Sequence, residues 1–123
     1  LLNSYISVKN ALVSSDSKAA STAISVFNDA VKGEDNFSQK TDLLKATEKL
    51  NKAGNNIEKQ RAAFNDVSTI MWKLVKSSDK VIQPVYYQYC PMKKAYWLSK
   101  EKDIKNPYYG SSMLTCGKVA ETK

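Results

Sequence analysis

The sequence predicts a mainly α fold: an antiparallel four-helix bundle that ends in a small C-terminal β-hairpin and loop appendage. The chain has 123 residues, which is enough for one domain with a buried core. Apolar residues recur with a helical period over about the first 80 residues. From Val81 this period gives way to β-branched and aromatic residues. We therefore expect a single domain over residues 1–123, with the bundle over about 1–80 and the appendage over about 81–123.

The first two helices are predicted from apolar stripes and from the residues that separate them. One stripe runs from Leu2 to Val13, and the polar segment 14–17 then breaks the helix and offers N-cap oxygens to the next one. The second stripe ends at Val31. We expect Gly33 to follow the second helix in the left-handed conformation, which costs little without a Cβ atom.

The third and fourth helices follow a polar loop. A weaker stripe over 43–50 predicts the third helix. Asn55 and Glu58 resemble a capping box at the start of the fourth. The fourth stripe, from Ile57 to Val75, is the strongest in the chain. Short connections between four such helices are typical of an antiparallel bundle.

Two strands are expected in the appendage. The run 81–90 favours an extended strand, and Pro84 should lie at its start or place it at a sheet edge. A second short strand is predicted over 95–99, after a turn formed by Pro91, Lys93 and Lys94. We expect little regular structure over 106–117. The tyrosines and tryptophans here should pack the appendage onto the bundle, whereas exposed rings could instead stack on single-stranded bases.

The composition excludes several classes of enzyme. The chain has no histidine, so serine–histidine or cysteine–histidine catalysis, HExxH proteases and histidine-based zinc sites are excluded. Its 4 glycines cannot form a GxGxxG motif or a P-loop. No catalytic residues can be assigned, and we expect a protein that is not an enzyme.

The excess of positive charge lies in the second half of the chain, where residues 67–123 hold ten basic and four acidic side chains. The formal net charge is +7, and Arg61 is the one arginine among 19 basic residues. This dominance of lysine argues against specific nucleic-acid binding. Lysines around 93–105 are expected to form a solvated face, or to attract an anionic lipid surface or an acidic partner. No apolar run approaches the ~20 residues of a membrane span, so we expect peripheral contact with a membrane at most.

Two sulfur pairs form the candidate site: Cys90 with Met92, and Met113 with Cys116. Thiolate and thioether ligands select soft ions such as Cu(I) or Ag(I), so these four residues are candidate metal ligands. The alternative is a structural Cys90–Cys116 disulfide, with both methionines filling the core. Such a bridge would stabilise the fold by roughly 3–4 kcal/mol in the chain-entropy model. A third possibility is that the two cysteines are unrelated buried thiols. All three interpretations stay open at this point.

Several motifs in the chain carry a family resemblance. They are IEKQRAAFNDVS at 57–68, YCPM at 89–92, AYWLS at 95–99, IKNPYYG at 104–110 and MLTCG at 113–117. With these motifs the chain resembles a bacterial domain of unknown function, which occurs in exported proteins and appended to the adaptor proteins of heavy-metal efflux pumps. The resemblance implies a periplasmic or exported location, with any signal segment removed. It also implies an efflux adaptor or another envelope protein as the partner.

A second resemblance concerns the metal site. The YCPM step is similar to the short metal-binding module of copper and silver exporters. That module continues with His-Pro, where this chain has Lys93 and Lys94. Metal binding by analogy is therefore implied first for Cys90 and Met92, and less directly for the MLTCG segment.

Overall fold

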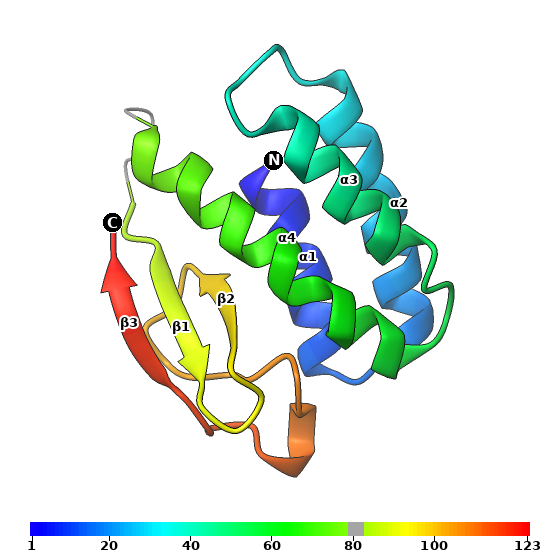
Figure 1. Cartoon of the computed structure of the whole chain (residues 1–123). Coiled ribbons are helices and arrows are strands. Elements are labelled where there is room, and N and C mark those ends of the chain that lie inside the picture. The colour runs from blue at the N-terminus through cyan, green and yellow to red at the C-terminus, as the bar shows by residue number, and fades with distance from the viewer. Residues whose placement is uncertain (79–82) are drawn as a thin grey trace.

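The computed structural model describes residues 1–78 and 83–123. In chain order its elements are α1 (Leu2–Val13), α2 (Ser17–Gly33), α3 (Lys40–Asn51), α4 (Ile57–Ser77), β1 (Tyr86–Cys90), β2 (Ala95–Ser99), the 3-10 helix η1 (Gly110–Ser112) and β3 (Lys118–Thr122). Four long helices are followed by three short strands (Figure 1). The predicted mainly α class is therefore confirmed.

Two of the helix starts are capped by side chains. Asp16 accepts the backbone N–H three residues later at 2.9 Å, which confirms a cap within segment 14–17. Asn56 caps α4 in the same way at 3.1 Å, so the capping box predicted for Asn55 and Glu58 is wrong by one position. The prediction that Gly33 follows the helix in the left-handed conformation is also wrong. Gly33 is the last helical residue of α2, and the chain leaves that helix in an extended conformation.

The helices pack mainly against their neighbours in the chain: α1 on α2, α2 on α3, and α3 on α4. Their arrangement as an antiparallel four-helix bundle stays a prediction. The sheet lies against α4 and has a smaller contact with α1. Figure 1 shows α2 and α3 on the side of α4 that faces away from the sheet. Among the described helices, none is long and apolar enough to cross a bilayer.

The appendage is a three-stranded antiparallel sheet in the order β2-β1-β3, not a hairpin. The second strand lies where it was predicted, and Pro84 precedes the start of β1. Val81 and Ile82 of the predicted first strand lie outside the described residues. Strand β3 was not predicted, because most of its side chains are polar and exposed and give no apolar alternation.

One face of the sheet packs on the helices through stacked aromatic rings. Tyr87 of β1 stacks on Trp72 of α4, with 4.8 Å between the ring centroids. Tyr96 of β2 stacks on Tyr87 at 4.5 Å. The buried residues of the helices and of the sheet form one continuous core. The expectation that aromatic residues pack the appendage onto the helices is therefore confirmed for these two tyrosines.

The outer edge of β2 is closed by side chains from α1, from α4 and from the loop before η1. The Asn65 side-chain oxygen accepts the Tyr96 N–H at 2.8 Å, and the Tyr5 hydroxyl accepts the Leu98 N–H at 3.0 Å. The Tyr108 hydroxyl donates to the Tyr96 carbonyl on the same strand. Because these side chains occupy backbone groups that another strand would need, β2 cannot readily be extended by a further strand.

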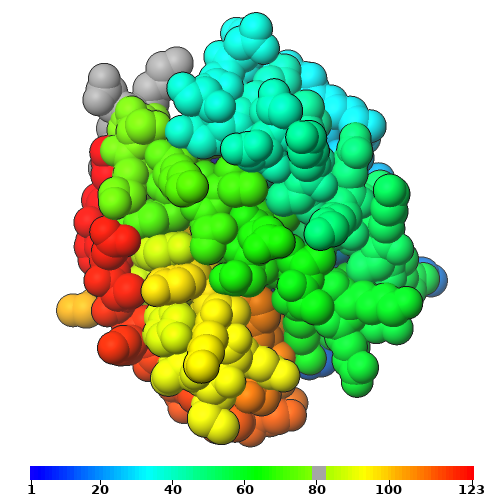
Figure 2. Space-filling model, viewed as in Figure 1, coloured from blue at the N-terminus to red at the C-terminus, as the bar shows by residue number. Residues whose placement is uncertain are grey.

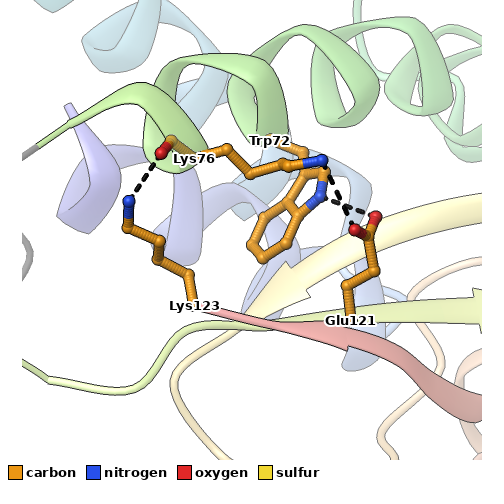
Figure 3. Close-up of polar contacts among 4 residues, drawn as sticks. All are labelled: Trp72, Lys76, Glu121 and Lys123. Atoms are coloured by element: carbon orange, nitrogen blue, oxygen red, sulfur yellow. Dashed lines mark hydrogen bonds and ion pairs between the residues drawn. The ribbon is translucent and has the colours of Figure 1, made fainter.

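At the other edge of the sheet, a polar cluster fastens β3 to α4 (Figure 3). The indole N–H of Trp72 donates to the Glu121 carboxylate at 2.9 Å. Lys76 lies 3.4 Å from the same carboxylate. The Lys123 ammonium donates to the backbone carbonyl of Lys76, near the end of α4. The last strand is thereby joined to the helical part of the chain.

Candidate functional site

The two cysteines meet on the face of the sheet that is turned away from the helices. Cys90 is the last residue of β1 and is fully buried, whereas Cys116 is half-buried in the segment that precedes β3. Burial, the nearby Cys90 and a hydrogen bond with the Cys90 side chain all raise the pKa of the Cys116 thiol. Two thiols that are far apart in the sequence are thus neighbours in space.

Both cysteines are free thiols within the described part of the chain. The Cys90–Cys116 disulfide that the alternative interpretation predicted is therefore absent from this structure. Each sulfur is held by its own segment, one on a strand and one on a loop. The thiols interact, but the sulfurs are not within bonding distance of each other.

A buried asparagine holds the segment that carries Cys116. The Asn106 side-chain amide donates to the Cys116 carbonyl at 2.7 Å, and its backbone N–H donates to the Leu114 carbonyl, also at 2.7 Å. Its side-chain oxygen accepts the Tyr108 N–H at 2.8 Å. Asn106 was expected only to lie in a loop of little regular structure, and the Asn-Pro step and the motif at 104–110 were the sequence signals that marked it.

Gly117 allows this segment to approach the sheet closely. Its φ is +147°, a conformation that side chains rarely adopt. A Cβ atom here would lie 2.9 Å from both the Trp97 ring and the Tyr89 carbonyl oxygen. The absence of a side chain at Gly117 therefore lets Cys116 reach β1.

The structure does not enclose the two methionines with the thiols. Met92 lies in the turn between β1 and β2 and is 65% exposed. Met113 follows η1 and is 40% exposed. The four predicted ligands therefore divide into a thiol pair, Cys90 and Cys116, and two surface thioethers.

A second pair of polar groups on the thiol-bearing face was missed by sequence reasoning. Gln88 and Trp97 lie directly opposite each other in the β1–β2 register, and both are fully buried. The Gln88 amide N–H groups donate to the carbonyls of Glu101 and Lys102, at 3.1 Å each. Among the described residues, the Gln88 side-chain oxygen and the Trp97 indole N–H have no hydrogen-bond partner. A buried group left unpaired in this way costs roughly 1–3 kcal/mol.

Several basic residues near the site make contacts with other side chains. The Lys93 ammonium lies 5.1 Å from the centre of the Tyr109 ring, which connects the β1–β2 turn to the residue before η1. Lys105 pairs with Glu101 at 3.2 Å, and Lys100 donates to the Asn3 side chain. Lys94 is exposed at the end of the turn, with a positive φ of 50°.

The thiol pair differs from a zinc site in the number of its ligands. Across residues 1–78 and 83–123, no three His, Cys, Asp or Glu side chains are grouped so that they could hold a metal ion. Zinc in proteins takes four such ligands in structural sites and three in catalytic sites. What the structure brings together is two soft sulfur atoms on a largely buried face.

Comparisons with known proteins give a family but no function. No curated protein and no solved structure matches the chain. Residues 1–82 match a family described as "Protein of unknown function (DUF3347)". These residues contain α1 to α4, so the sheet and both cysteines lie outside the matched part. Because the match covers more than half of the sequence, the chain belongs to the DUF3347 family of proteins of unknown function.

Proposed function

We propose that this protein is a non-enzymatic module of the cell envelope that binds Cu(I) or Ag(I) through Cys90 and Cys116. The observation that carries the proposal is the direct interaction of the two thiols across the buried face of the sheet. Thiolate ligands select soft ions, and Cu(I) and Ag(I) accept coordination by two or three of them.

Binding would replace two thiol protons by one metal ion. Each thiol gives its proton to solvent as it becomes a ligand, so the affinity depends on pH. The Trp97 indole N–H is a free donor on the same face as Cys90. Hydrogen bonds from such groups stabilise ligating atoms and tune their basicity. The site would thus offer two soft ligands, limited contact with water and one spare donor.

We propose the periplasm or the outside of the cell as the location, and an efflux adaptor or another envelope protein as the partner. This part of the proposal rests on the motif resemblance over residues 57–117. The positive charge of the second half would favour an acidic surface on that partner. We propose neither nucleic-acid binding nor a catalytic role.

The test is a titration of fully reduced protein with Cu(I) against a competing chelator. The double variant Cys90→Ser, Cys116→Ser should lose affinity by more than the roughly 10–100-fold that is typical of outer-shell partners. The control variant Lys93→Ser, Lys94→Ser changes the adjacent turn without removing a sulfur atom, and it should bind as the wild type does. Unchanged affinity in the cysteine variant would exclude the proposed site. Zn(II) should bind far more weakly than Cu(I), because only two ligands meet.

The alternative is a structural or protein-interaction domain whose Cys90–Cys116 bridge holds the tail and which binds no metal. The free thiols in this structure count against it. The mass of the unreduced protein decides between the two, since a bridge makes the chain two hydrogen atoms lighter. A bridged protein that binds no metal after reduction would support the alternative.

A further inference from the structure

We propose that Met92 and Met113 form a surface relay through which a soft monovalent ion reaches the thiol pair and leaves it again. This inference rests on the proposed metal binding at Cys90 and Cys116 and describes how that site exchanges its ion. The sequence alone placed all four sulfurs in one site, whereas the structure separates them by exposure.

Met92 and Met113 are exposed, although they are large apolar side chains. Across the described residues, three large hydrophobic side chains are exposed, namely Val26, Met92 and Met113. The remaining methionine, Met71, is 1% exposed in the helical core. Two methionines thus remain at the surface, where their burial would otherwise stabilise the fold. A role for their sulfur atoms gives a reason for this exposure.

A short turn of the chain links each exposed thioether to one of the two thiols. Met92 lies in the turn that begins directly after Cys90. Met113 and Cys116 close another tight turn, in which the Cys116 N–H donates to the Met113 carbonyl at 3.1 Å. An ion held by either thioether would therefore be only one turn of chain from a thiol.

The two turns also lie at the same end of the molecule. The contact between Lys93 and the Tyr109 ring connects the Met92 turn to the residue before η1, and Met113 directly follows η1. In Figure 2, the atoms of the β1–β2 region adjoin those of the segment around η1 at the lower end of the molecule. The segments that carry Met92 and Met113 therefore lie near each other at one end of the molecule.

The exposure of the four sulfur-bearing side chains sets the order of the steps. Met92 and Met113 are open to solvent, Cys116 is half-buried and Cys90 is fully buried. An arriving ion would therefore meet the thioethers first. It would then move to Cys116 and Cys90, whose two thiol protons pass to solvent. Release to a partner follows the reverse order.

Transfer rates test this relay separately from affinity. Reduced protein is mixed rapidly with a Cu(I)–chelator complex, and loss of the complex is followed by absorbance. The variant Met92→Leu, Met113→Leu keeps the apolar volume and should slow both uptake and release by about tenfold or more. The equilibrium affinity should stay within about twofold of wild type, because a transient station changes both rates equally. The control Met71→Leu alters the buried methionine and should leave uptake unchanged.

Each outcome has a distinct meaning. If the double methionine variant takes up Cu(I) as fast as the wild type, the relay is wrong while the thiol site stands. If its affinity falls together with its rate, the thioethers are permanent ligands and the relay is again wrong. If the Cys90→Ser, Cys116→Ser variant binds as tightly as the wild type, the proposed function fails and the relay fails with it.

Discussion

The Trp72 indole N–H donates to the Glu121 carboxylate at 2.9 Å and so joins the longest helix to the last strand. Trp72 lies within the residues that match the family, whereas Glu121 lies outside them. The indole is 4% exposed and also stacks on Tyr87. One tryptophan therefore links the helical part that matches the family to the sheet whose strand β1 carries Cys90.

We expect Glu121→Ala to lower the free energy of unfolding by about 1–2 kcal/mol, because it removes a hydrogen bond to a charged acceptor. The ion pair with Lys76 adds little to this, since both side chains are about half exposed. Glu101→Ala is the matched control. It removes an exposed carboxylate 3.2 Å from Lys105 and should cost roughly 0.5 kcal/mol or less. Urea unfolding measures both variants, and equal losses would contradict a special role for the Trp72 bond.

Gly117→Ala should loosen the segment that presents Cys116. The new Cβ atom would lie 2.9 Å from the Trp97 ring and from a backbone oxygen, at a φ that favours glycine. Such a position costs of order 1–3 kcal/mol when a side chain is forced onto it. The thiol of Cys90 should also react faster with a thiol reagent, because the segment that carries Cys116 and covers Cys90 is displaced.

Gly33→Ala provides the control for that experiment. A Cβ atom there has no neighbour within 4 Å, and its φ lies outside the left-handed range. The change should stabilise the protein by about 0.4–1 kcal/mol, by restricting the unfolded chain. If Gly117→Ala were as stable as Gly33→Ala, with an equally protected Cys90, the close approach at Gly117 would not matter.

Tyr5 should make stability sensitive to alkaline pH. Burial raises the pKa of Tyr5 well above its usual value, even though its hydroxyl bonds the Ser68 hydroxyl at 2.6 Å and the Leu98 N–H. The folded protein therefore keeps this proton when the unfolded chain loses it, near pH 10. Stability is fully present below about pH 10 and falls as the pH rises above it.

Tyr5→Phe tests this directly. At neutral pH the variant should lose about 1–3 kcal/mol, because the Leu98 N–H and the Ser68 hydroxyl are left without their partner. Above pH 10 its unfolding free energy should fall less steeply than that of the wild type. Urea unfolding at several pH values gives both quantities. A parallel pH dependence in the two proteins would mean that Tyr5 titrates normally in the fold.

The helices could be predicted because their signals are local. Apolar periodicity and polar caps lie within a few residues of one another, and all four helices were found near their predicted positions. The boundary at Asn55 was wrong because the neighbouring Asn56 provides the same kind of cap, and the boundary at Gly33 was wrong because this glycine remains in the helix. Strand β3 has no local apolar signal, and it is ordered by pairing with β1 and by Glu121.

The sequence indicated which residues to consider for the candidate site, but not their geometry. The sequence placed Cys90 and Cys116 in one candidate site, and the structure brings their thiols together. Their meeting depends on Asn106 and Gly117, which hold a loop against a strand over a long sequence separation. The exposure of Met92 could not be derived from spacing, because a methionine fits a core or a surface turn equally well.

Metal affinity should rise with pH across the neutral range. The pKa of the Cys116 thiol is raised, first by burial and then by the neighbouring Cys90, so this thiol stays protonated at neutral pH. The Cu(I) binding that we propose would displace that proton. Loss of the Cys116 proton alone should therefore raise the apparent affinity about tenfold per pH unit between about pH 6 and pH 8. Competition titrations against a chelator of known pH dependence measure this slope, and Cys116→Ser should reduce it by about one proton. A wild-type affinity that stays constant over this range would show that Cys116 is not a thiolate ligand.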